Sequence, residues 1–132
     1  MKIKYILAPI LLAGFASQAT ASDCSVTIDS TDAMRFDKDK ITIDTSCEEF
    51  TIKLTHSGQL AKNIMGHNVV ITKTADLTEV SRDAMSAGLE NQYVKPDDDR
   101  VIVFTDLIGG GEETSTTFET AKFTAGEDYT FF

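Results

Sequence analysis

Phe50-Thr51-Ile52-Lys53-Leu54-Thr55-His56 is the stretch that decides the fold class, because apolar and polar side chains alternate along its length. Successive side chains of a β-strand point to opposite faces, so this period of two predicts a strand with one face in a core. His56 is in phase with the apolar residues and should also face the core. We therefore interpret His56 as a structural residue.

Similar patterns recur on both sides of this stretch. We expect further strands over residues 24–29, 36–43, 68–73, 101–104, 115–119 and from 129 onward, with a turn at Gly109-Gly110-Gly111. The pattern has the helical period only near residues 75–87, where Thr74 or Asp76 could cap the start and Gly88 could end the helix. Short strands with one inserted helix predict an all-β fold, an antiparallel Greek-key β-sandwich.

The first 21 residues have the features of a secretory signal peptide. Two lysines precede a short apolar stretch, and Ala19-Thr20-Ala21 is a small-residue cleavage site. A membrane anchor is the alternative, but it needs about 20 apolar residues. We expect cleavage to leave residues 22–132 as one domain in the periplasm.

The two cysteines, Cys24 and Cys47, form an even number after an export signal, which favours a disulfide. Closing a loop of this size stabilises a fold by about 3 kcal/mol in the chain-entropy model. Free or metal-bound thiols are the alternatives, although neither cysteine has another cysteine or a histidine within a few residues. The alternation through Val26 and Ile28 predicts that Cys24 points inward.

Charge and short motifs exclude several classes of function. A net charge of −9 repels nucleic acid and anionic lipid, so we expect neither as a partner. Asp97-Asp98-Asp99 lacks the closing glutamate of a calcium loop, and Gly109-Gly110-Gly111 is not followed by the lysine of a phosphate-binding loop. Ser57 and His56 would point to opposite faces of a strand. We therefore expect a protein that is not an enzyme.

Two stretches are specific enough to indicate a family. They are Lys62-Asn63-Ile64-Met65-Gly66-His67-Asn68 and Lys95-Pro96-Asp97-Asp98. Together with Asp23-Cys24-Ser25-Val26, Leu107-Ile108-Gly109 and Phe131-Phe132, they make the chain resemble the cupredoxin (blue copper) family over essentially all of residues 22–132.

The resemblance implies a periplasmic type 1 copper protein that carries single electrons. It implies that Gly66 binds the metal through its backbone carbonyl and His67 through its imidazole. Asn68 would hydrogen bond the ligand loops to one another. In the family, the remaining cysteine, histidine and methionine ligands lie on a loop that follows the Phe-Phe pair.

Phe132 is the last residue of the sequence. We therefore expect a domain that is incomplete at its C-terminus, with its final strand missing. Without a thiolate, we do not expect a complete copper site.

The resemblance also implies a docking surface. Met34, Met65 and Met85 match positions that border an apolar patch over the metal, although methionines also fill gaps in cores. The implied partners are periplasmic redox proteins such as c-type cytochromes or copper reductases. We expect a monomer with no membrane contact after signal cleavage. The alternative function is a non-redox exported β-sandwich that binds a partner.

Overall fold

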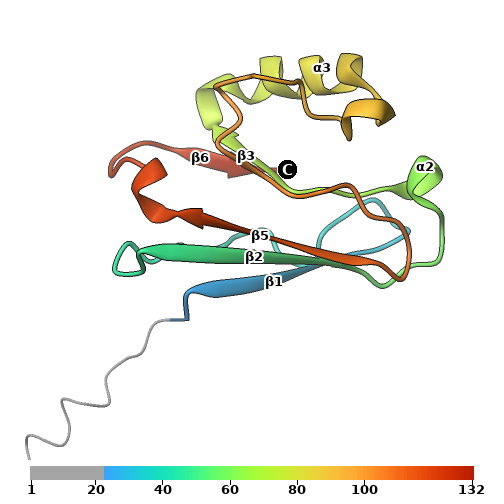
Figure 1. Cartoon of the computed structure of the whole chain (residues 1–132), viewed down its shortest axis with the longest axis horizontal. Helices are drawn as coiled ribbons and strands as arrows, with labels where there is room; N and C mark the ends of the chain where they lie inside the picture. Colours follow the sequence, from blue (N-terminus) through green and yellow to red (C-terminus); the bar gives the residue numbers. More distant parts are fainter. Residues whose placement is uncertain (1–22) are drawn as a thin grey trace, which may run out of the picture.

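The computed structural model describes residues 23–132, so the expected signal peptide lies outside the described residues. Two three-stranded sheets face each other (Figure 1). The first has the order β1-β2-β5, with β1 at Ser25–Ser30, β2 at Glu49–His56 and β5 at Glu113–Glu119. The second has the order β4-β3-β6, with β4 at Val103–Phe104, β3 at Val70–Lys73 and β6 at Tyr129–Phe131. The expected all-β sandwich is confirmed.

The expected helix is α3, Leu77–Ala87, which covers the outer face of the second sheet in Figure 1. Val80 and Ala84 are its buried residues, and Gly88 ends it with a φ of 71°. The predicted N-cap is wrong, because no side chain caps the helix and the chain enters it through a 3-10 turn, η1, at Thr74–Asp76. The Thr74 hydroxyl bonds instead to that of Thr130, at 2.8 Å.

Three shorter elements were not expected from the sequence. They are the one-turn helix α2 at Lys62–Met65 and the 3-10 turns η2 at Leu89–Asn91 and η3 at Thr120–Lys122. No helix among residues 23–132 is long and apolar enough to cross a membrane.

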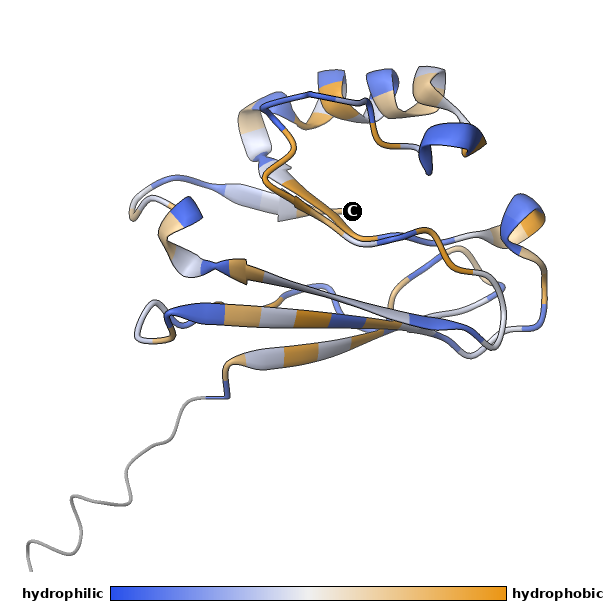
Figure 2. Ribbon diagram, viewed as in Figure 1, coloured by the Kyte–Doolittle hydropathy of each residue, from blue (hydrophilic) through white to orange (hydrophobic). Residues whose placement is uncertain are grey.

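The core lies between the sheets and follows the alternation along β2. Phe50, Ile52 and Leu54 are each at most 1 % exposed, as is Ile28 of β1. Figure 2 shows the same alternation as bands of apolar and polar colour along the ribbon of β2. The period of two therefore fixes which face of β2 meets the core.

One strand pairing differs from the prediction. β1 and β2 are parallel, with Ser25 opposite Thr51 and Ser30 opposite His56. Parallel strands need a long crossover connection, and residues 31–48 provide one. The other strand pairs are antiparallel.

Two predicted strands are shorter or absent. Residues 36–43 form no ladder apart from an isolated bridge between Ser30 and Phe36, although Ile41 and Ile43 still pack against the core. The predicted strand at 101–104 is reduced to Val103–Phe104, and Phe104 is 45 % exposed. Alternation alone showed which side chains meet the core but not whether the backbone finds a neighbour.

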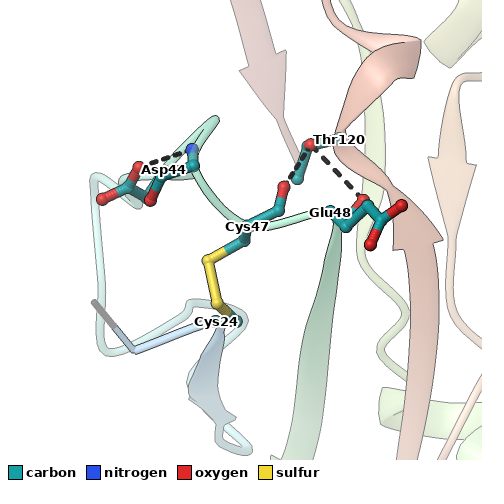
Figure 3. The surroundings of a disulfide bond; sticks show 6 residues. Cys24, Asp44, Cys47, Glu48 and Thr120 are labelled. Atoms are coloured by element: carbon teal, nitrogen blue, oxygen red, sulfur yellow. Dashed lines mark hydrogen bonds between the residues drawn. A yellow bond between two sulfur atoms is a disulfide. The ribbon is translucent and has the colours of Figure 1, made fainter. Parts of the chain in front are cut away.

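A disulfide joins Cys24 to Cys47 and ties the start of β1 to the start of β2 (Figure 3). Cys47 is buried, but Cys24 is exposed because it precedes the first residue of the strand. The prediction that Cys24 points inward is therefore wrong, although the predicted bond is present. The Thr120 hydroxyl donates to the backbone carbonyl of Cys47 and holds the bridge against the end of β5.

Candidate metal centre

The centre of the candidate site is the turn that α2 makes before β3. The backbone N–H groups of Ile64 and Met65 both donate to the carbonyl of Ala61, at 2.9 Å each. Gly66 follows with φ −73° and ψ 145°, a conformation open to any residue. A Cβ on Gly66 would lie 2.3 Å from the carbonyl oxygen of Lys62. Glycine is thus required here because the two backbones approach closely.

His67 is held by two backbone hydrogen bonds and one side-chain hydrogen bond. Its N–H and C=O bond to the C=O and N–H of Ile108, at 3.0 and 2.9 Å. Its ring Nε2 lies 2.8 Å from the carbonyl oxygen of Thr31. A carbonyl only accepts, so Nε2 is the nitrogen that carries hydrogen.

The Thr31 bond leaves Nδ1 of a neutral His67 ring with its lone pair. Among the hydrogen bonds of residues 23–132, none involves this nitrogen. A histidine that ligates a metal donates its other ring N–H in this way, which fixes both its tautomer and its orientation. The Thr31 bond therefore leaves Nδ1 as the ring nitrogen of His67 that is open to another contact.

His56 lies beside His67 with ring centroids 4.9 Å apart, but it is bonded differently. It is 2 % exposed. Its Nδ1 accepts the backbone N–H of Gly58 at 3.0 Å, and its Nε2 donates to the carbonyl of Met65 at 2.8 Å. Both ring nitrogens are occupied, so His56 is a structural residue that fixes the carbonyl preceding Gly66.

Asp32 braces the loop that carries His56. Its carboxylate accepts the backbone N–H groups of Gln59 and Leu60 at 2.8 and 3.2 Å. These bonds, the Gln59 bond first, hold the pKa of Asp32 below its ordinary value, with smaller contributions from His56 and His67. Sequence reasoning missed both Thr31 and Asp32. Thr31 acts through its main chain, which leaves no signal in the residue type.

Asn68 connects the candidate site to the segment after α3. Its side-chain amide donates to the carbonyl of Gln92 at 2.8 Å, and the Gln92 side chain accepts the N–H of Leu107 at 2.7 Å. Gln92 has a φ of 55°, in the left-handed region. The predicted bond from Asn68 between the ligand loops stays a prediction. Gln92 was not selected from the sequence, because its role depends on that turn.

The donors that the described residues bring together make up part of a metal site. No group of three or more His, Cys, Asp or Glu side chains in residues 23–132 could hold a metal ion, and both cysteines are in the disulfide. The set therefore reduces to the imidazole of His67 and the carbonyl of Gly66. A trigonal copper site also needs a thiolate and a second imidazole, so these residues alone do not fit a complete site.

Comparison with known proteins identifies the family. Residues 22–132 match the family model described as copper binding proteins, plastocyanin/azurin family. This chain belongs to that family. The predicted copper cofactor and cupredoxin relationship are thereby confirmed.

Several curated azurins are similar to the chain over most of its length. The azurin of Bordetella pertussis is 52 % identical over 122 residues, which are 92 % of this chain and 81 % of the relative. The azurin of Pseudomonas chlororaphis is 53 % identical over 111 residues, 84 % of this chain and 87 % of the relative. The azurin of Pseudomonas aeruginosa is 45 % identical over 130 residues, 98 % of this chain and 88 % of the relative. The predicted function, blue copper electron transfer, is confirmed at this level.

The methionines that the family resemblance singled out differ in exposure. Met34 and Met85 are 76 % and 73 % exposed, whereas Met65 is half-buried. Ile64 of α2 is also exposed, at 66 %. Figure 1 places α2 and the C-terminal end of α3 toward the same end of the sandwich.

Proposed function

We propose that the protein is a periplasmic carrier of single electrons, with Gly66 and His67 supplying two ligands of a type 1 copper centre. The observation that carries this proposal is the bond from His67 Nε2 to the carbonyl of Thr31, which leaves Nδ1 for a metal. Bound copper supplies the one-electron couple. The two cysteines are paired and both ring nitrogens of His56 are hydrogen bonded, so the described residues do not supply the thiolate or the second imidazole of such a centre.

The contribution of this chain is a rigid half of the site. His67 is fixed at its backbone by Ile108 and at its ring by Thr31. The carbonyl before Gly66 is fixed by His56. Ligands held by a bonded scaffold stay in one geometry, and such a geometry can suit both oxidation states of a carrier.

We infer that partners dock over the exposed apolar side chains of Met34, Ile64 and Met85, together with Met65. Exposed apolar patches mark interaction sites, and redox partners typically form small, transient interfaces. Periplasmic redox proteins such as c-type cytochromes or copper reductases fit this mode. The proposal is a monomeric carrier rather than an enzyme.

The first experiment tests the ligand assignment on the 132-residue chain. Nitrogen-15 NMR should show neutral His67 as the Nε2–H tautomer, with Nδ1 responding to added Zn(II), a diamagnetic ion that does not broaden the neighbouring His56 ring. His56 should show the same tautomer but little response, because its Nδ1 is already hydrogen bonded. If Zn(II) shifts both rings equally, or His67 carries hydrogen on Nδ1, the assignment is wrong.

The second experiment tests the electron-carrier function. The chain is extended after Phe132 by the cysteine–histidine–methionine ligand loop that the family resemblance implies, and Cu(II) is added. An intense visible absorption of the copper–thiolate bond is expected, and His67→Ala should reduce it strongly. A colourless extended protein would overturn the copper assignment, and a colour unaffected by His67→Ala would overturn the role of His67.

A further inference from the structure

We propose that Gln92 is a positioning residue, which fixes the strand register around His67 by bonding a β-bulge next to it. The bulge consists of Asn68 on one segment and of Asp106 and Leu107 on the other. Each of these three residues is hydrogen bonded to Gln92. The inference rests on the proposed function of His67 as a ligand, although the bonds themselves do not involve the His67 ring.

The bulge follows from a change of register within the second sheet. β3 and β4 pair with Val70 opposite Phe104. The same register, continued, would place His67 opposite Leu107. Instead, an isolated bridge joins His67 to Ile108. The segment that follows β4 therefore contains one extra residue, and this residue lies next to the candidate ligand.

Hydrogen bonds show where the extra residue lies. The register of β3 and β4 continues as far as Thr105, whose N–H donates to the carbonyl of Val69 at 3.0 Å. Between this bond and the His67 bridge, Asn68 alone lies opposite residues 106–107. Two residues against one define a β-bulge, which takes backbone groups out of the ladder. Such groups need other partners when they are buried.

Gln92 supplies the partner for one such group. Leu107 is 5 % exposed, and a buried N–H without an acceptor costs free energy. This N–H donates to Oε1 of Gln92 at 2.7 Å. On the same side, Nε2 of Gln92 donates a longer bond to Oδ1 of Asp106, at 3.4 Å. On the other side, the backbone carbonyl of Gln92 accepts the side-chain amide of Asn68 at 2.8 Å. One residue therefore holds both sides of the bulge.

A strained turn places Gln92 where it can make these bonds. Gln92 and Tyr93 have φ values of 55° and 56°, in the left-handed region that residues with a Cβ rarely adopt. Their N–H groups donate to the carbonyls of Leu89 and Gly88, at 2.9 Å each, which closes the turn after α3. Strained backbone persists where surrounding contacts maintain it, and it clusters at functional sites. The bonds to the bulge are such contacts.

The bulge decides which residue lies opposite His67. A shift of one residue in register exchanges the two faces of a strand relative to its partner. With the bulge in place, Ile108 is opposite His67, and both Ile108 and Leu107 are buried. Bulges near functional sites re-aim side chains in this way. Loss of the Leu107 bond should therefore loosen the bridge to Ile108, and with it the bond from the His67 ring to Thr31.

The main test is Gln92→Met in the full 132-residue chain without metal, because methionine keeps the length of the side chain but removes the acceptor. Amide exchange followed by NMR should show Leu107 protected in the unchanged protein and exchanging at least about tenfold faster in the variant. The Ile52 amide of β2 reports the stability of the whole fold, and its rate should change by less than about threefold.

The ring of His67 provides a second measurement that a general loss of stability would not move. Nitrogen-15 NMR should show a single Nε2–H tautomer in the unchanged protein and a mixture of both tautomers in Gln92→Met. When Zn(II) is then added, the His67 ring of the variant should need roughly tenfold more of the ion for the same response, since groups that orient a ligand affect metal affinity to this extent.

Two further variants separate the hydrogen bonds from the turn. The double substitution Gln92→Glu with Asp106→Asn exchanges the amide and the carboxylate, so it keeps an acceptor for the Leu107 N–H. It should restore both the slow exchange of Leu107 and the single tautomer of His67. The matched control is Asn91→Ala, which removes a side-chain amide from the same turn, where it donates to the end of α3. This variant should leave both measurements unchanged.

Three outcomes would overturn the proposal. If Leu107 in the unchanged protein exchanges as fast as an exposed amide, its bond to Gln92 does not form. If Gln92→Met accelerates Leu107 and Ile52 by the same factor, Gln92 only stabilises the fold. If Leu107 is released but the tautomer and the Zn(II) response of His67 stay the same, the bulge does not position the ring.

The design also covers a variant that fails to fold. In that case the exchanged pair, Gln92→Glu with Asp106→Asn, decides the question, because it should fold with Leu107 protected, and an unprotected Leu107 there would contradict the proposal. A His67 ring that ignores Zn(II) in the unchanged protein would count against the proposed ligand role instead. The tautomer and exchange measurements, which use no metal, would still test Gln92.

Discussion

Removal of the disulfide by the double substitution Cys24→Ala and Cys47→Ala should lower the stability of the fold substantially. The two cysteines are 23 residues apart in sequence. In the chain-entropy model, a cross-link that closes a loop of this size contributes about 3 kcal/mol. For a domain of this size, that corresponds to a fall in Tm of roughly 15 °C. The bridge also lies where β1 and β2 start, so its loss frees the first residues of a parallel pair that no hairpin supports.

The assay is thermal unfolding followed by circular dichroism, on the oxidised protein, on the protein with a thiol reductant and on the double variant. Reduction and substitution should give similar shifts, and the reductant should not change the Tm of the variant. Thr120→Val is a matched control, because it removes the hydroxyl that binds the Cys47 carbonyl but keeps the bridge. It should cost only about 1–3 kcal/mol. A shift below about 3 °C with both thiols shown to be free would refute the loop-closure reasoning.

Three further predictions follow from other parts of the structure. Gly66→Ala should destabilise the fold and broaden the NMR signals of the α2 turn, because a Cβ would lie 2.3 Å from a backbone oxygen; an unchanged Tm would contradict the close approach. The side-chain hydrogen bond from Arg100 lowers the pKa of Asp98. The pair therefore contributes its full stabilisation at pH values above the ordinary aspartate pKa of about 4, and this stabilisation is lost as the pH falls through the lowered pKa. Asp98→Asn should therefore lower the urea midpoint more at neutral pH than at about pH 2; an equal loss at both would argue against the ion pair. Met34→Lys and Met85→Lys should each change the free energy of unfolding by no more than about 0.5 kcal/mol, since both side chains are exposed. Both substitutions should slow electron exchange in the copper-loaded extended protein. Unaltered exchange rates would show that these residues are not part of the docking surface.

The sequence predicted well the elements whose apolar side chains lie on one face. The alternation from Phe50 to Leu54 identified β2 and its buried face, and it placed His56 correctly at 2 % exposure. The helical spacing of Val80 and Ala84 identified α3 and its buried stripe. In each case the local sequence pattern shows which face is buried. This does not depend on which strand or sheet the face packs against.

Which strands pair, and in which direction, depends on residues far apart in the sequence. The local pattern therefore did not predict it. The pattern from Phe36 to Ile43 predicts inward side chains, and the structure has them, but no neighbouring strand completes a ladder with this backbone. Likewise, the pattern of β1 does not indicate that its partner runs parallel. Both properties depend on the path that residues 31–48 take from β1 to β2, and the alternation within this segment does not show which strand its backbone will meet.

The same distinction applies to the candidate metal centre. Residue types at Gly66 and His67 predict the two ligands that we propose, but a histidine is a usable ligand only when the correct nitrogen is free. That choice is made by the Thr31 carbonyl, 36 residues away, and the position of this carbonyl is set in turn by the Asp32 brace on the next loop. Any residue type could provide that carbonyl, so no motif records it. The chemistry of His67 is therefore decided by the crossover between β1 and β2, the segment whose path the sequence specified least clearly.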